Sequence, residues 1–391
     1  MKIENKIPYL VIVAAIFFMA FYFVAGRMQM NDDGFQYEGF AESLAGGFLD
    51  FKSFYGFQGL SFFAVPVFWL THSHNSIIIT SMIFSLLSIP LAYSVGRDFY
   101  GSRRAGIYFL ILFLLTPYPY TTMMRGFQEA ALLFFILLVI YGSVNRKLWT
   151  PIAWAVGGIV KPFALTLAPL FLLSTLPTSQ VGNGKTVDKR HRKSVIHRWK
   201  NAIWLLIALG IGAAYLGISY YQTGHLVNNA AINSYQGNFD TGNPPPLVES
   251  FTLGVKGYLR VGANLLLHFR KIMISPLVII LGALALWFNK GIRLRKEIIA
   301  AIILNFLLVG SLTFSFSKYL LPMTTLFALA SVSYLLKYRW LMWLVLVDSF
   351  FVFLPIWNYF GHNYWPNIYV YFLPFCVAIV VLLFSRTEKL N

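Results

Sequence analysis

Long apolar stretches separated by short basic segments make up most of the chain. Apolar runs of helical length predict helices at 8–26, 76–96, 105–117, 127–144, 201–221, 272–288, 298–314, 319–336, 340–357 and 367–384. Within 150–177 we expect two shorter helices with a turn at Lys161-Pro162, because proline ends or kinks a helix. These segments predict an all-α, polytopic membrane protein with about 12 transmembrane helices, in a range of roughly 10 to 13.

Basic residues between the apolar runs set the predicted orientation, because positively charged loops face the cytoplasm. The most basic segment, 178–200, has seven Lys and Arg between Lys185 and Lys200. Two crossings within 150–177 keep this segment inside, and both termini are then cytoplasmic. We therefore expect one transmembrane domain over 1–391 without a separate soluble domain, with a first outer loop at 27–75 and a long outer loop at 222–271.

The second half of the first outer loop has a different pattern. Residues 48–73 are aromatic and amphipathic, and they are interrupted by Gly56, Gly59 and Pro66. Segments of this kind lie in the membrane interface with one apolar face buried. We therefore expect interfacial or half-inserted helices here.

The composition supports this assignment. Of the 391 residues, 58% are hydrophobic and only 12% are charged, which is too apolar for a water-soluble domain. The net charge of +17 would indicate nucleic acid if the basic residues formed one face of a soluble domain, but they lie in short clusters between apolar runs. Membrane lipids are therefore expected partners, and nucleic acid is not. The single cysteine, Cys376, excludes an internal disulfide and a cysteine metal cluster.

Acidic residues gather in 31–47, directly after the first apolar run. Four of the 14 Asp and Glu of the chain lie here: Asp32, Asp33, Glu38 and Glu42. Tyr37, Ala41 and Leu44 recur at helical spacing, which predicts a short helix that begins at the Asp32-Asp33 pair, where the helix dipole favours carboxylates. Adjacent helical residues point about 100° apart, so one acid can be a base while the other orients a ligand or a metal. A loop that merely carries two acids is the alternative.

The segment 32–47 resembles the first outer loop of the C-type membrane glycosyltransferases, with their acidic pair, downstream Tyr, Ala and Leu, and closing Gly. The layout is most similar to the subgroup of protein O-mannosyltransferases and aminoarabinose transferases. Phe35-Gln36-Tyr37 also resembles the mannosyltransferases that use dolichol-phosphate mannose, although Glu38 sits one residue off their pattern. Three further stretches fit the superfamily in order: 97–104 with a following helix that ends in Pro117, 157–162, and 318–322.

This resemblance implies the transfer of a monosaccharide from a polyprenyl-phosphate donor to an acceptor hydroxyl or amine outside the cytoplasmic membrane, with inversion. By the family pattern Asp32 is the base and Asp33 the supporting acid. The phosphate departs as a stable anion, so one base suffices, unlike the two-carboxylate scheme of glycosidases. Adjacent carboxylates are compatible with a divalent metal ion without requiring one. A lipid, a glycan and a protein all remain as acceptors.

Positive charge for the donor phosphate is present on the predicted outer side. Lys161 and Lys318 lie in otherwise apolar runs, where a lone cation costs about 2.5 to 3.5 kcal/mol at mid-span, so we expect a partner anion. The alternatives are that each lysine reaches the headgroups or pairs with an acid such as Asp348. Arg125 and Arg260 are further candidates for the phosphate, although Arg260 fits lipid anchoring equally well.

Candidates for binding the substrates are Glu129, Tyr37, Tyr55 and Tyr319. An acid near Glu129 faces the site in the resembling family, but Arg125 is one helical turn away from Glu129 and the two fit a simple ion pair. The tyrosines can stack on a sugar, or they can belong to the aromatic belt at the membrane interface.

Two other functions compete with this reading. A lipid-linked glycan ligase or polymerase would depend on outer Arg and His instead of a carboxylate base. A non-enzymatic transporter or flippase for a lipid-linked sugar would place ionisable groups at mid-bilayer and show inverted repeats, whereas Asp348 is the one acid deep in a predicted span and no repeat is visible. The chain has no glycine-rich phosphate loop, so a nucleotide sugar is not supported as the donor.

Overall fold

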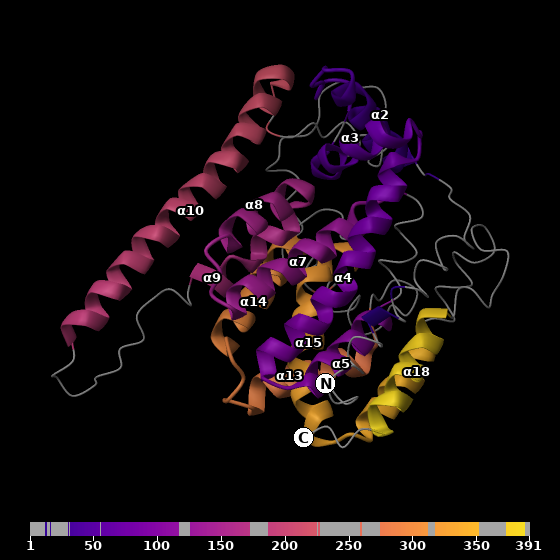
Figure 1. Cartoon of the computed structure of the whole chain (residues 1–391), viewed down its shortest axis with the longest axis vertical. Coiled ribbons are helices and arrows are strands. Elements are labelled where there is room, and N and C mark those ends of the chain that lie inside the picture. Colours follow the sequence, from indigo (N-terminus) through magenta and orange to yellow (C-terminus); the bar gives the residue numbers. More distant parts are fainter. Residues whose placement is uncertain are drawn as a thin grey trace.

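The structure is a computed structural model. It describes residues 30, 32–54, 56–116, 126–172, 187–224, 226, 259, 274–311, 317–351 and 373–387, together with Ile12, Val13 and Ile16. All regular elements within these residues are helices, and no strand occurs among them. The all-α prediction is confirmed for this part of the chain (Figure 1).

The helices follow one another in a single order. They are α2 (Asp32–Ala45), α3 (Gly59–Thr71), α4 (Ser76–Tyr100), α5 (Arg103–Leu114), α7 (Glu129–Val144), α8 (Thr150–Val160), the 3-10 helix η2 (Pro162–Leu167), α9 (Pro169–Leu172), α10 (Val187–Thr223), α13 (Pro276–Phe288), α14 (Arg295–Ser311), the 3-10 helix η5 (Ser317–Leu320), α15 (Leu321–Lys337), a helix at Leu341–Phe351, and α18 (Leu373–Thr387).

The break predicted at Lys161-Pro162 is present. Lys161 is extended, with φ of −158°, and separates α8 from η2. Two other expectations need correction. Helix α10 begins at Val187 instead of 201, because 187–200 holds good helix formers and neither Gly nor Pro. Pro66 lies inside α3 instead of interrupting it.

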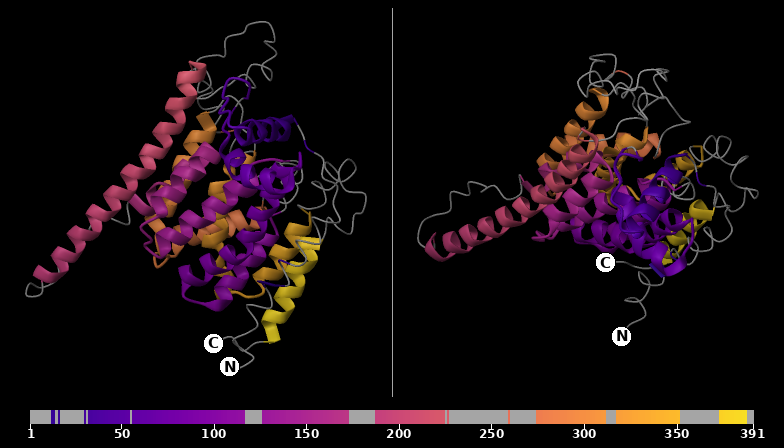
Figure 2. Two further views of the ribbon diagram at one scale, coloured as in Figure 1. Left: turned by 45° about the horizontal axis from the view of Figure 1, so that its top comes forward. Right: turned by 90° about the horizontal axis from the view of Figure 1, so that it is seen from above.

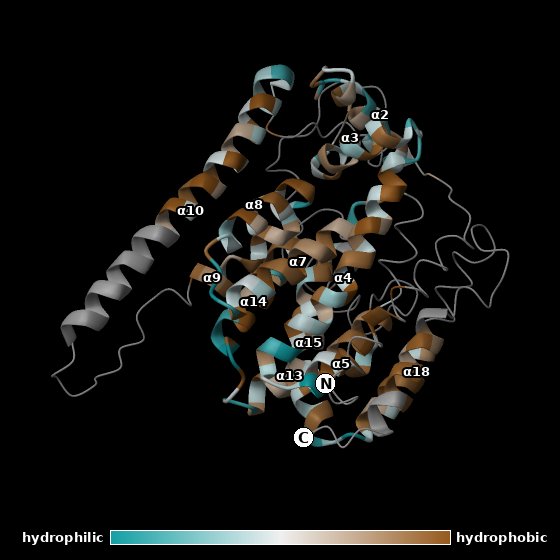
Figure 3. Ribbon diagram, viewed as in Figure 1, coloured by the Kyte–Doolittle hydropathy of each residue, from teal (hydrophilic) through white to brown (hydrophobic). Residues whose placement is uncertain are grey.

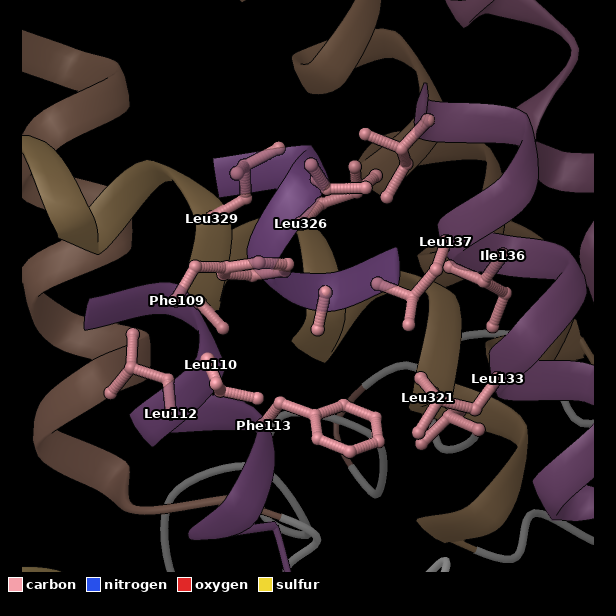
Figure 4. Close-up of a cluster of buried hydrophobic side chains, with 14 of the residues drawn as sticks. Phe109, Leu110, Leu112, Phe113, Leu133, Ile136, Leu137, Leu321, Leu326 and Leu329 are labelled. Atoms are coloured by element: carbon pink, nitrogen blue, oxygen red, sulfur yellow. The ribbon is translucent and has the colours of Figure 1, made fainter. Parts of the chain in front are cut away.

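Apolar packing between α5, α7 and α15 forms the centre of the bundle. Every residue from 105 to 114 of α5 is buried, as expected for a helix that is apolar on all sides. Side chains of α5 such as Phe109 and Phe113 lie beside Leu133 and Leu137 of α7 and Leu326 of α15 (Figure 4). Helix α10 runs along one side of this bundle and packs against α8 (Figure 2).

Two of the described helices are long and apolar enough to cross a bilayer, α4 and the 202–223 part of α10. Other apolar helices have 10–17 residues. A helix of 13 residues is about 20 Å long, shorter than the roughly 30 Å hydrocarbon core of a bilayer. The count of 12 spans therefore stays a prediction.

One end of the bundle joins three of the basic segments predicted to be cytoplasmic. Asp98, near the end of α4, pairs with Arg97 at 2.6 Å and accepts a hydrogen bond from Asn145 Nδ2 at 3.1 Å. Arg293 donates to the carbonyl of Asp98 at 3.4 Å and to that of Val144. In Figure 3 hydrophilic residues gather in this region and around α2, at opposite ends of an apolar middle. The segments that were predicted to share a side of the membrane are therefore neighbours in the fold.

Candidate active site

Helix α2 begins at the acidic pair, as its helical periodicity predicts. Asp32 is the first residue of the helix and Asp33 is partly buried. The first turn of a helix presents unpaired N–H groups and the positive end of the dipole, which favours carboxylates there. The sequence therefore fixes where the two acids sit along α2.

Glu38 anchors α2 to the start of α4. Its buried carboxylate accepts hydrogen bonds from Ser76 Oγ at 2.6 Å, from the Ser76 N–H at 3.2 Å and from the Ile77 N–H at 2.7 Å. These donors belong to the first turn of α4, where a carboxylate also meets the helix dipole favourably. Glu38 is thus a helix cap that sets the position of the acidic pair, and the cap explains why a carboxylate is needed at this position.

We expect Glu38→Ala to lower the free energy of unfolding by about 2 to 4 kcal/mol, because it removes a cap and leaves buried donors without an acceptor. The thermal unfolding midpoint in detergent measures the loss. Glu42→Gln is the matched control, since Glu42 lies one turn further along α2 and is partly exposed. Equal midpoints for the two variants would contradict the capping role.

Glu42 itself pairs with His74 at 2.5 Å, outside the buried part of the bundle. The hydrogen bond and the charge of the Glu42 carboxylate raise the pKa of His74 above its usual value. The stabilising effect of this pair is therefore fully present at acidic pH and is lost as the pH rises through the raised pKa. It is a surface interaction, so its contribution is small.

The segment 126–128 packs the start of α7 against α2. A β-carbon added to Gly126 would lie 3.0 Å from the α-carbon of Gly34, the residue after the acidic pair, and φ of +77° also favours glycine there. Ser81 Oγ donates to the Phe127 carbonyl at 3.2 Å, and Gln128 Nε2 donates to the carbonyl of Phe57. The first residue of α7, Glu129, is consequently held near the first turn of α2.

Glu129 forms an ion pair with Lys161 Nζ. The Glu129 side chain is 0% exposed and that of Lys161 is 12% exposed. A close approach brings Lys161 here: a β-carbon on Gly59 would lie 2.4 Å from the backbone nitrogen of Val160, so only glycine lets α3 reach the end of α8. Lys161 therefore has the partner anion that its burial requires.

This pairing decides between the alternatives left by the sequence. Glu129 pairs with Lys161 instead of Arg125 alone, and Lys161 does not pair with Asp348. Asp348 accepts hydrogen bonds from Ser275 Oγ and from the Leu277 N–H, the latter at 3.0 Å, and so caps α13. Each partner was out of reach for sequence reasoning because it depends on how helices pack.

The turn η5 brings the 318–322 motif to the same ion pair. The Tyr319 ring stacks on Phe163 with ring centroids 4.3 Å apart, and Lys161 Nζ lies 5.9 Å from the centre of the Tyr319 ring. Asn305 of α14, which is 0% exposed, donates to the Tyr319 carbonyl at 3.3 Å. The two motifs that carry the predicted phosphate lysines are therefore neighbours.

The other predicted site residues divide into two groups. Tyr37 packs into the main hydrophobic core, and its carbonyl accepts a hydrogen bond from Ser61 Oγ at 2.8 Å. Outside the described part of the chain are Arg125, Arg260, Tyr55 and the side chains of Asp32 and Lys318. Their roles stay predictions.

The described residues contain no group of three or more His, Cys, Asp or Glu side chains that could hold a metal ion. The divalent ion considered for the acidic pair therefore stays a prediction from the sequence. Asn305 and Gln128, by contrast, are polar residues of this region that sequence reasoning missed. A lone Asn in the apolar run of α14 was the visible signal for the first of them.

Solved structures with this fold include the aminoarabinose transferase ArnT from Cupriavidus metallidurans. Its structure bound to undecaprenyl phosphate matches with a TM-score of 0.54 at 13% identity, over 97% of this chain and 77% of that chain. Its structure in the apo state matches with a TM-score of 0.53 at 12% identity over the same shares. No protein-family model and no curated protein matches the chain.

Proposed function

From the C-type membrane glycosyltransferase fold that this chain shares with ArnT, we propose that it transfers a monosaccharide from a polyprenyl-phosphate donor to an acceptor hydroxyl or amine. The reaction takes place on the outer face of the membrane and inverts the anomeric centre. Asp32 is the general base, Asp33 the supporting acid, and both termini are cytoplasmic. A transmembrane domain of about 12 helices fits this arrangement.

One observation carries the proposal. The helix that begins with the acidic pair, the start of α7 and the end of α8 meet at one end of the bundle, through the contact of Gly126 with Gly34 and the pair of Glu129 with Lys161. A carboxylate base and a cation for the departing phosphate are the two groups that the reaction needs.

The chemistry follows from these groups. The acceptor oxygen or nitrogen attacks the anomeric carbon while the bond from that carbon to the phosphate oxygen breaks. The acceptor proton passes to Asp32, and the electron pair of the broken bond leaves with the polyprenyl phosphate. Fixed positive charge stabilises the developing anion, which in a site shielded from water is worth more than in bulk solvent.

Lys161 is the described cation for that role, together with the predicted Lys318, Arg125 and Arg260. In the structure Lys161 is neutralised by Glu129, so an incoming phosphate competes with the Glu129 carboxylate for the ammonium group. Such an exchange keeps the buried charge compensated both before and after the donor binds. Glu129 and Tyr319 then border the sugar. The long outer loop at 222–271 is left to contact the acceptor, which favours a lipid or a glycan over a protein.

The decisive experiment is a screen for thermal stabilisation of the purified protein. We expect undecaprenyl phosphate and at least one of its mannosyl, glucosyl or aminoarabinosyl derivatives to raise the unfolding midpoint, while nucleotide sugars do not. Binding to a donor site stabilises the folded state in proportion to the logarithm of ligand concentration. Stabilisation by a lipid-linked oligosaccharide alone would indicate a ligase or polymerase, and no response to any polyprenyl phosphate would refute the proposal.

A further inference from the structure

Gln36 of α2 has a buried carboxamide oxygen that the bundle does not use. Gln36 Oε1 is inaccessible to solvent and has no hydrogen-bond partner among the described residues. Most buried polar atoms in proteins are hydrogen-bonded, because an unpaired one loses its hydration without compensation. A conspicuous exception of this kind calls for an explanation, and a ligand is one.

The position of Gln36 on α2 suggests which ligand. It follows Asp33 by three residues and Asp32 by four, and positions with these spacings share one side of a helix. The opposite side of α2 faces the bundle through four buried residues, Gly34, Tyr37, Glu38 and Ala41. Gln36 therefore stands beside the acidic pair and away from the packing face.

The next turn of α2 adds an aromatic surface. Phe40, four residues after Gln36, is 0% exposed and contacts Phe51, with ring centroids 5.2 Å apart, and Phe54, at 5.8 Å. The loop that carries these rings is fixed to α10, because Gln222 accepts from the Phe51 N–H at 2.8 Å and donates to the Leu49 carbonyl at 2.7 Å. Gln36 thus lies between carboxylates and a rigid apolar wall.

This combination matches the chemistry of a pyranose ring. A carboxamide accepts from one hydroxyl and donates to its neighbour, while the C–H face of a sugar packs against aromatic rings. Neither group assists the departure of the phosphate, which concerns Lys161 at the start of α7. We propose that Gln36 binds a hydroxyl group of the transferred sugar and so contributes to the choice of sugar, an inference that rests on the function proposed above.

The alternative is a purely structural glutamine, and the two roles predict opposite results for Gln36→Met. Methionine has a similar length and no polar atom, so removing an unpaired buried amide raises the unfolding midpoint of the ligand-free protein. If Gln36 also holds the sugar, the same variant binds undecaprenyl phosphate as the parent does but binds the glycosylated donor about tenfold more weakly, the effect of one lost hydrogen bond to a ligand.

The test compares the parent with Gln36→Met by thermal shift, using undecaprenyl phosphate and the mannosyl, glucosyl and aminoarabinosyl derivatives as probes. Gln128→Met is the matched control for stability, since Gln128 donates to the Phe57 carbonyl and its loss lowers the midpoint. Parent-like affinity of Gln36→Met for every glycosylated probe overturns the role of Gln36 alone. A parent that discriminates no glycosylated probe from undecaprenyl phosphate removes the inference, and a parent that binds none of the probes removes the proposed function as well.

Discussion

Asp32→Asn is expected to reduce the turnover of a polyprenyl-phosphate sugar by about 10²- to 10⁴-fold, the usual contribution of a general base. Asparagine keeps the size and the hydrogen-bonding capacity of the side chain but cannot take the acceptor proton. Donor binding should therefore be unchanged, as measured by thermal shift. The rate is followed by the release of polyprenyl phosphate in membranes that contain the native acceptor.

Two neighbouring acids make this prediction specific. Asp33→Asn should reduce the rate less than Asp32→Asn, because Asp33 supports the reaction without accepting the proton. Glu42→Gln should leave the rate at the parent value, since Glu42 lies at the other end of α2 in a surface pair with His74. A turnover of Asp32→Asn within twofold of the parent would refute Asp32 as the base and, with it, a carboxylate-dependent transferase.

Breaking the Lys161–Glu129 pair is expected to give the second large effect. Lys161→Met leaves the fully buried Glu129 carboxylate without its lysine, and removing one partner of a buried ion pair costs about 3 to 5 kcal/mol of unfolding free energy. In the double variant Lys161→Met/Glu129→Gln both charges are gone, so most of this loss should be recovered. Unfolding in detergent, followed by temperature or denaturant, measures both variants.

The double variant separates stability from function. If Lys161 holds the donor phosphate, the refolded and stable double variant should still bind undecaprenyl phosphate at least about tenfold more weakly than the parent, which corresponds to about 1.4 kcal/mol. The affinity is obtained from the concentration dependence of the thermal shift. Binding equal to that of the parent would show that the pair serves only to hold α7 against α8.

Local sequence features predicted much of the fold. The helical spacing of Tyr37, Ala41 and Leu44 placed the start of α2 at the acidic pair, and proline placed the break after Lys161. Charge on the connecting segments predicted that three basic loops share one end of the bundle, which the contacts of Asp98 and Arg293 confirm. The weak points were helix ends: α10 starts earlier than its apolar run because helix propensity does not depend on hydrophobicity.

The candidate site was harder to predict than the helices. Glu38 was one of four acids in a row of candidates, and nothing in its neighbourhood along the chain marks it as the cap of α4, 38 residues away. Gln36 and Asn305 were passed over because a single amide has no characteristic spacing. Their significance lies in burial and in hydrogen bonds, which the sequence does not contain.

The sequence by itself determined the class of the protein, the order of its helices, the end of α2 that carries the carboxylates and the break that exposes Lys161. These follow from hydropathy, backbone conformation and the helix dipole, which act over a few residues. Only the tertiary structure decided that Lys161 meets Glu129, 32 residues away, instead of Asp348 or a headgroup. The physical reason is that a buried charge takes whichever opposite charge the packing of helices brings within reach, and glycines such as Gly59 and Gly126 set that packing by permitting backbones to touch.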